Sequence, residues 1–156
     1  MASNNGSTAN GIERFLGSEL AAEIEFLTAR TRSLGSMRAN ALLAPLELKV
    51  RSYSVLSLAC SGLAPTQREL AEFLSLDPSQ IVPLVDQLEN RGLVERKPDP
   101  NDRRSKVISG TADGAKLYKK ARKATAEGEA RSMERLSKEE QETLRGLLSR
   151  IAFPAS

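Results

Sequence analysis

Residues 66–111 decide the fold and read TQRELAEFLSLDPSQIVPLVDQLENRGLVERKPDPNDRRSKVISGT. Thr66 and Glu69 have the spacing of a capping box, in which a hydroxyl and a carboxylate each satisfy a backbone N–H left open at a helix start. Asp77, followed by a proline and with Gln80 at the third helical position, gives a second start signal. Two short capped helices joined by a tight turn predict a helix-turn-helix.

The residue pattern changes after Gly92. Residues 93–97 and 105–109 have the composition of two strands, and the prolines and acids between them indicate a turn. A hairpin directly behind a helix-turn-helix is a wing. Gly110 follows the second strand, and we expect it to loosen the junction with the next helix.

On both sides of residues 66–111, apolar residues recur at helical spacing. It predicts a long first helix over 12–34 that exits at Gly35, a second over 46–60, a fifth capped by Thr111, and a last one that begins at Ser137. The fold class is therefore mainly α with a small β-hairpin (α+β), a winged helix-turn-helix with further helices before and after it.

The composition is that of one soluble globular domain: 156 residues, 40% hydrophobic and 28% charged. We read residues 1–11 as a disordered arm, because Asn, Ser, Gly and Thr bury little apolar surface. No run approaches the roughly 18 apolar residues of a membrane span. With no histidine and one cysteine, Cys60, the chain lacks the usual zinc ligands and the Ser-His or Cys-His pairs of hydrolases. We expect a cytoplasmic protein that is not an enzyme and needs no cofactor or metal.

Basic residues gather behind the second capped helix, although the net charge is only +3. Residues 91–106 hold six basic side chains against three acids, and residues 116–123 hold five and no acid. A solvated face is the ordinary interpretation of such runs. The position of the first run, beside a helix-turn-helix, instead favours contact with DNA phosphates.

The stretch from Thr66 to Thr111 closely resembles the MarR family of bacterial transcription regulators. The helix-turn-helix residues carry part of the resemblance. Its most specific part is the wing, Asp99-Pro100-Asn101-Asp102-Arg103-Arg104-Ser105-Lys106, which is similar to the Asp-x-Arg wing pattern of that family. The flanking helices match in number and order. The resemblance implies a dimer built by the first, fifth and sixth helices, a recognition helix in the major groove, and a wing in the adjacent minor groove.

These expectations define the domain plan and the DNA-binding residues. Residues 12–156 form a single domain, with 12–45 and 111–156 as the helical dimerisation region and 46–110 as the DNA-binding lobe. The expected DNA-binding residues are Thr66, Gln67, Arg68, Ser79, Gln80, Val82, Pro83, Gln87, Arg91, Arg96, Lys97, Asp102, Arg103, Arg104 and Lys106.

Individual roles follow from residue chemistry. Gln80 can pair with an adenine edge, or it can merely complete the helix cap. Pro83 removes one backbone N–H and predicts a modest kink. By resemblance, Arg103 or Arg104 enters the minor groove, and Asp102 orients an arginine through a charge-assisted hydrogen bond.

The remaining predictions concern partners. Apolar residues near both ends supply more surface than one small core needs, so we expect a homodimer on a palindromic operator. They could instead cover one another within one chain. The expected interface residues are Ile12, Phe15, Leu16, Leu144, Leu147, Leu148 and Ile151. By resemblance, a small aromatic or phenolic acid is the expected ligand, with Arg51 and Tyr53 supplying a cation and a ring. Tyr53 could equally be a core residue.

The function that these predictions favour is sequence-specific binding of double-stranded DNA by a ligand-responsive repressor. The alternative is a winged-helix module for protein–protein contact, which would show no salt-dependent binding to duplex DNA.

Overall fold

A computed structural model describes residues 11–102 and 104–154 of the chain. The chain divides into two compact units, residues 1–37 and residues 38–156, which are taken separately below. The predicted arm over residues 1–11 lies outside the described residues, apart from Gly11. Arg103 of the wing also lies outside them.

The first unit differs from the single long helix that apolar spacing predicted over 12–34. After one turn of helix at 11–13 the chain makes a bend, a short 3-10 helix η1 (Glu19–Ala22), and then enters α2 (Ile24–Leu43). The Ser18 hydroxyl donates to the carbonyl of Phe15 at 2.7 Å and accepts from the amide of Ala21 at 3.4 Å. Such local bonds compete with the helical ladder, and they explain the early break.

The predicted helix exit at Gly35 was also wrong. Helix α2 continues through Gly35 and Ser36 to Leu43, because the good helix formers that follow outweigh one internal glycine. It ends at Leu43, two residues before Pro45, which has no backbone N–H to continue the α-helical hydrogen bonds. The predicted connector at Pro45 is the 3-10 helix η2 (Ala44–Leu46).

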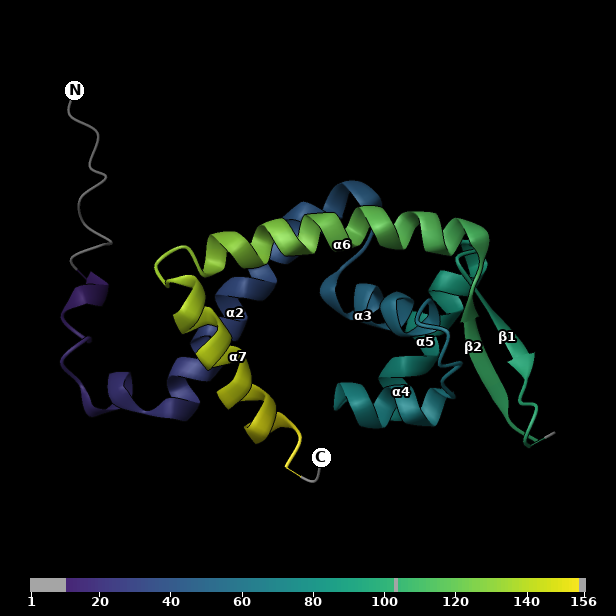
Figure 1. Cartoon of the computed structure of the whole chain (residues 1–156), viewed down its shortest axis with the longest axis horizontal. Helices are drawn as coiled ribbons and strands as arrows, with labels where there is room; N and C mark the ends of the chain where they lie inside the picture. The colour runs from purple at the N-terminus through teal and green to yellow at the C-terminus, as the bar shows by residue number, and fades with distance from the viewer. Residues whose placement is uncertain (1–10, 103, 155–156) are drawn as a thin grey trace. The chain divides into compact units, whose positions relative to one another are not determined.

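The second unit has the predicted order of elements (Figure 1). Its helices and strands agree with the predicted ones to within a few residues. After η2 they are α3 (Val50–Ala59), α4 (Gln67–Leu74), α5 (Pro78–Asn90), β1 (Val94–Pro98), β2 (Lys106–Gly110), α6 (Ala112–Ser132) and α7 (Lys138–Ala152).

The predicted helix caps are all present. The amide of Glu69 donates to the Thr66 hydroxyl at 3.2 Å, and the amide of Thr66 donates to the Glu69 carboxylate at 2.7 Å. Equivalent reciprocal boxes open the next capped helix and the last one, at Asp77 with Gln80 and at Ser137 with Glu140. The local residue order alone therefore sets where these helices begin.

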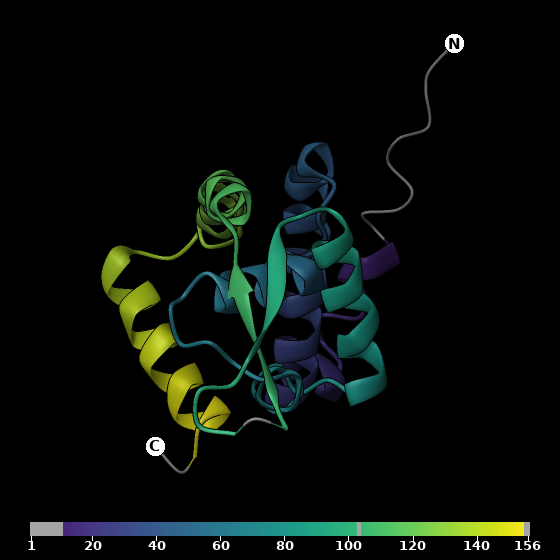
Figure 2. The ribbon, with the colours of Figure 1, turned by 90° about the vertical axis from the view of Figure 1, so that its right-hand side faces the viewer.

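The hairpin is attached to the helix-turn-helix through β2. Within the described residues it forms a two-stranded antiparallel sheet, with Val94 opposite Gly110 and Pro98 opposite Lys106 (Figure 2). The amide of Ile108 donates to the carbonyl of Pro65 at 2.8 Å, just before α4. This bond fixes the wing relative to the first turn of α4.

The core of the second unit gathers around α5. Ile81, Val85 and Leu88 on its inner face are fully buried. They pack in one cluster with fully buried side chains from the neighbouring elements, among them Leu43, Val55, Leu56, Leu70 and Ile108. Burying one face of α5 leaves the opposite face to solvent.

The junction between β2 and α6 is tight, which corrects the expectation that Gly110 loosens it. A Cβ on Gly110 would lie 3.3 Å from the Cα of Cys60, so the absent side chain permits close packing. The Thr111 hydroxyl donates to the carbonyl of Gly92 at 2.6 Å and accepts from the amide of Gly114 at 3.0 Å. The start of α6 is thus bound to the turn between α5 and β1.

No helix in the described part of the chain is long and apolar enough to cross a membrane.

Candidate nucleic-acid interface

The outward face of α5 is polar and open. Ser79, Gln80, Val82, Pro83 and Gln87, all predicted to meet DNA, are exposed. The side-chain oxygen of Gln80 accepts from the amide of Asp77 at 3.3 Å, so the capping role that competed with base contact is present. The helix runs without interruption through Pro83.

A hollow lies between the first turn of α4, helix α5 and the wing. It encloses about 810 Å³. Most of its lining residues had been predicted from the sequence to contact DNA. The lining is Thr66, Gln67, Arg68, Glu69, Glu72, Val82, Arg96, Arg104, Ser105 and Lys106. The hollow is where helix-turn-helix and wing residues converge.

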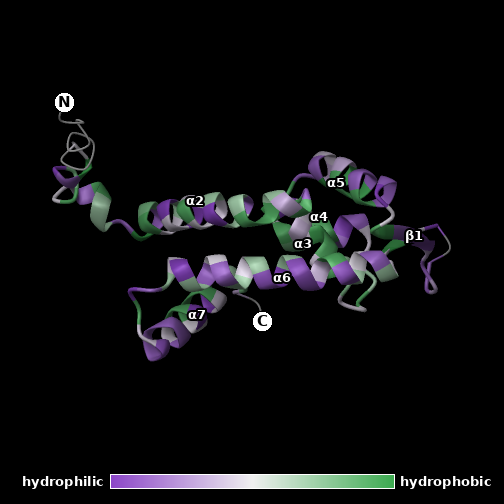
Figure 3. Cartoon of the chain, turned by 90° about the horizontal axis from the view of Figure 1, so that it is seen from above, coloured by the Kyte–Doolittle hydropathy of each residue, from purple (hydrophilic) through white to green (hydrophobic). Residues whose placement is uncertain are grey.

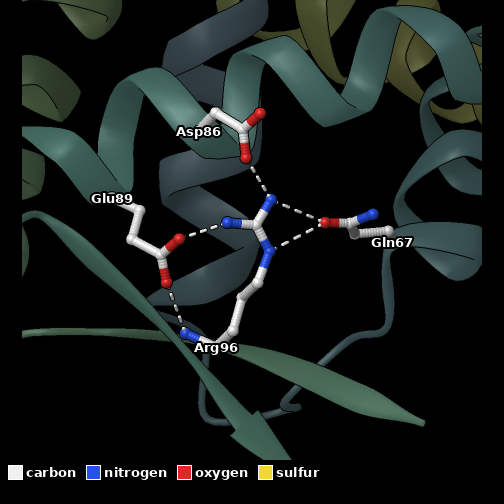
Figure 4. A network of polar contacts seen from close by, with 4 residues as sticks. All are labelled: Gln67, Asp86, Glu89 and Arg96. Carbon is white, nitrogen blue, oxygen red and sulfur yellow. Dashed lines mark hydrogen bonds and ion pairs between the residues drawn. The ribbon is translucent and has the colours of Figure 1, made fainter.

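Arg96 on β1 forms a polar network with two helices (Figure 4). Its Nε and Nη2 donate to the side-chain oxygen of Gln67 at 3.0 and 2.9 Å. Nη2 also donates to Asp86 at 2.5 Å, and Nη1 donates to Glu89. Burial alone would lower the pKa of the Arg96 guanidinium, but the bonds to Asp86 and Glu89 outweigh it, and the pKa lies above its ordinary value. The sequence predicted a DNA contact for Arg96. In the structure its guanidinium instead donates to three side chains of the same chain.

Arg91 is engaged within the chain as well. Its Nη1 donates to the carbonyl of Glu47 at 2.7 Å, and its Nη2 donates to the carbonyl of Leu46 at 3.1 Å. These bonds join the C-terminal end of α5 to η2. The sequence had predicted Arg91 as a DNA-binding residue, whereas its guanidinium here connects two elements of the fold.

The far end of the wing is hydrophilic (Figure 3). The Asp102 carboxylate accepts from the backbone amide of Arg104 at 3.0 Å, which shapes the turn. That Asp102 orients an arginine side chain stays a prediction, because Arg103 lies outside the described residues. Arg104 and Lys106 are exposed. Lys97 is 54% exposed and pairs with Glu95 at 2.7 Å.

A separate aromatic pair lies between α3 and α6. The rings of Tyr53 and Tyr118 stack at 6.1 Å between centroids and 23° between planes. Hydrogen bonds with Ser57 and then Arg122 lower the pKa of the Tyr118 phenol. Arg122 donates to the Tyr118 oxygen at 3.4 Å. The sequence did not single out Tyr118 as a site residue, because its partner Tyr53 is far away along the chain.

The predicted partner of Tyr53, Arg51, lies on a different face of α3. Residues two positions apart on a helix do not face each other, so these two side chains do not form a joint site by themselves. Arg51 is exposed, while Tyr53 is half-buried.

The apolar residues of α7 are largely open within one chain. Leu147, Leu148 and Ile151 are 49, 42 and 69% exposed. Leu144 and Leu148 line a groove of about 250 Å³ together with Met133 and Phe153. In the first unit, the predicted interface residues Ile12, Phe15 and Leu16 are also exposed.

No group of three or more His, Cys, Asp or Glu side chains suited to a metal ion occurs within the described ranges.

Comparison with known proteins identifies the family. The sequence model of the MarR family matches residues 50–106. The multiple antibiotic resistance protein MarR of Salmonella typhimurium is 32% identical over 114 residues, which cover 72% of this chain and 78% of that protein. The chain belongs to the MarR family.

Solved structures of MarR-family proteins confirm the winged helix-turn-helix fold. CouR from Rhodococcus jostii RHA1, bound to p-coumaroyl-CoA, is 41% identical, with a TM-score of 0.82 over 89% of this chain and 98% of that one. The transcriptional repressor CouR bound to a 23-mer DNA duplex is 29% identical, with a TM-score of 0.78 over 86% and 96%. This MarR-family chain is therefore a DNA-binding transcription regulator, and its relatives are regulators, not enzymes.

Proposed function

We propose that this MarR-family protein is a repressor that binds a palindromic operator as a homodimer and responds to a small aromatic ligand. The observation that carries the proposal is the open polar face of α5 beside a hollow that basic wing residues also line. It acts in the cytoplasm, where the bacterial chromosome lies, and it regulates without catalysing a reaction.

The charge distribution assigns base contacts to α5 and phosphate contacts to the basic residues around it. From Asp77 to Asn90 the recognition helix has three acids and no basic residue, so it cannot attract phosphate by side-chain charge. Its exposed residues, Ser79, Gln80, Val82, Pro83 and Gln87, read base edges in the major groove. Attraction to phosphate comes from basic side chains around it, Arg68, Lys97, Arg104 and Lys106, and the sequence adds Arg103 to this set. Phosphate contacts supply most of the non-specific affinity for DNA.

Residues 12–45 and 111–156 form the proposed dimerisation region, and residues 46–110 form the DNA-binding lobe. The support is the row of exposed leucine and isoleucine side chains on α7, which a monomer would leave in water. A two-fold dimer places two recognition helices on successive turns of the DNA, which is why a palindromic operator is expected.

The proposed ligand is a phenolic acid or its coenzyme A thioester, and the site is the stacked pair of Tyr53 and Tyr118. The relative CouR, bound to p-coumaroyl-CoA, supports this ligand class. The Arg122 guanidinium beside the Tyr118 oxygen offers a cation for a carboxylate or phosphate group. A ligand weakens operator binding only by as much as it prefers the DNA-free state.

Titration of fluorescent duplexes tests the proposal. Purified protein is added to a duplex from its own promoter region and to a shuffled duplex of equal length, at several salt concentrations. We expect tighter binding to the promoter duplex and a log Kd that rises linearly with log salt. No binding even at low salt would instead support the protein–protein module, and equal binding to both duplexes would refute sequence-specific recognition.

A further inference from the structure

The guanidinium of Arg96 is already occupied by protein partners. Nε, Nη1 and Nη2 all donate to Gln67, Asp86 or Glu89, and the backbone amide of Arg96 donates to Glu89 at 3.1 Å. The side chain is only 19% exposed. An arginine binds phosphate with the same planar set of N–H groups that these partners occupy. Arg96 is therefore poorly placed to contact DNA itself.

The two bonds from Arg96 determine which end of the Gln67 amide can form a hydrogen bond with another molecule. The Gln67 oxygen accepts from both Nε and Nη2. Turning the amide over would bring its NH2 group against the N–H groups of the guanidinium, donor against donor. The NH2 end consequently points away from Arg96 (Figure 4), and Gln67 is among the residues that line the hollow.

Three cationic side chains line the hollow together with Gln67: Arg68 from α4, and Arg104 and Lys106 from the wing. Glu69 and Glu72 of α4 also line it, so the wing side is its more positive side. Arg96 also offsets part of the negative charge of Asp86 and Glu89, which would otherwise repel a phosphate. An amide that offers only N–H donors beside these cations suits a phosphate oxygen, which only accepts hydrogen bonds.

We propose that Arg96 is a positioning residue that holds the Gln67 side chain so that its NH2 group donates to a backbone phosphate of the operator. The inference rests on the proposed function, because it needs the hollow to face DNA. It assigns Gln67 to the contact with DNA and removes Arg96 from it.

Phosphate ethylation interference provides the test. The wild-type pattern identifies the operator phosphates whose ethylation weakens binding. We expect Gln67→Met to abolish interference at one phosphate in each half-site, and Arg96→Met to abolish it at the same phosphate. Arg96→Lys keeps the charge but lacks the planar set of donors, so it should share this loss. If Arg96→Met removes a phosphate that Gln67→Met retains, Arg96 itself contacts DNA and the proposal is wrong.

A double-variant cycle gives a second readout that loss of stability would not imitate. Gln67 is neutral, so its contact with a phosphate releases no counterion, and Gln67→Met should leave the slope of log affinity against log salt unchanged. At one salt concentration, the double variant Gln67→Met with Arg96→Met should bind as weakly as Arg96→Met alone, because both changes remove the same contact. A double variant whose loss of affinity equals the sum of the two single losses would overturn the proposal. Should Arg96→Met fail to fold in thermal melts, Arg96→Lys replaces it in this comparison.

Arg104→Ala separates this inference from the proposed function. If Arg104→Ala weakens binding while Gln67→Met leaves both affinity and interference unchanged, only the role of Arg96 and Gln67 is wrong. If neither variant changes binding, the hollow does not face DNA, and the proposed function fails with the inference.

Discussion

Gly110 packs so closely against Cys60 that a Cβ at residue 110 would lie 2.4 Å from the cysteine Sγ. The contact joins the last residue of the wing to the C-terminal end of α3. Burial raises the pKa of the Cys60 thiol, which keeps it protonated and suits a packing role better than a reactive one. The wing is thereby held against the helical core just before α6 begins.

Gly110→Ala should destabilise the protein, because either the Cys60 side chain or the strand must move to admit the methyl group. The expected loss is about 1–3 kcal/mol in urea denaturation. Gly146→Ala on α7 is the matched control, since nothing lies within 4 Å of a Cβ there. That control should be neutral or stabilising by up to about 1 kcal/mol. Adding Cys60→Ala to Gly110→Ala should recover part of the loss; full stability of Gly110→Ala alone would refute the contact.

The capping box of α4 predicts a pH dependence. Its bonds, first that with the Thr66 amide and then that with the Thr66 hydroxyl, hold the pKa of Glu69 below its ordinary value of 4.5. A carboxyl whose folded-state pKa is lowered stabilises the fold above the unfolded value, and this contribution is lost as the pH falls through the folded value. Wild type should therefore exceed Glu69→Gln in stability at pH 7, and the difference should vanish toward pH 3. Solvent screens this exposed group, so the difference should stay below about 0.5 kcal/mol. A difference that grows in acid would contradict the assignment.

The sequence predicted those features of the fold that depend on neighbouring residues. Thr66 with Glu69, and Asp77 with Gln80, mark helix starts because each cap bonds only three residues along the chain. The N-terminal region was harder, since the bend at Ser18 and the passage of α2 through Gly35 depend on small differences between competing local bonds. Apolar spacing alone does not resolve such differences.

The same distinction applies to the candidate site. The exposed face of α5 follows from helical periodicity and could be predicted. The bonds of Arg91 to Glu47 and of Arg96 to Gln67 connect residues 44 and 29 positions apart. Only the tertiary structure brings them together, and a basic side chain read from the sequence gives no sign that its donors are already in use.

Arg104→Ala should weaken operator binding about tenfold or more, or about 1.4 kcal/mol, because it removes an exposed charge from the wing beside the hollow. Fluorescence anisotropy with the promoter duplex measures the change. Arg135→Ala removes another exposed arginine, between α6 and α7, and serves as the control. Equal losses for both variants would mean that net charge alone, and not the wing, determines affinity.

Leu147→Glu should dissociate the proposed dimer. A carboxylate buried in an apolar interface without a partner costs several kcal/mol, whereas the leucine is 49% exposed in one chain and leaves little core to disturb. Light scattering at micromolar concentration should give a dimer for wild type and a monomer for the variant. Leu63→Glu is the control, because Leu63 is 79% exposed in the loop before α4. A wild-type monomer, or a Leu147→Glu dimer, would rule out this interface.

The aromatic pair predicts how the regulator responds to its ligand. If p-coumaroyl-CoA binds the DNA-free protein alone, a concentration of 100 times its Kd should weaken apparent operator affinity roughly a hundredfold. Tyr53→Leu should abolish this response because it removes a stacked ring, and Arg122→Ala should reduce it because the cation beside Tyr118 is lost. Arg51→Ala should respond like wild type, since Arg51 lies on another face of α3. All three variants should bind DNA normally without ligand, as measured by anisotropy. A ligand response that survives Tyr53→Leu but is lost in Arg51→Ala would move the ligand site away from the tyrosine pair and onto the exposed face of α3.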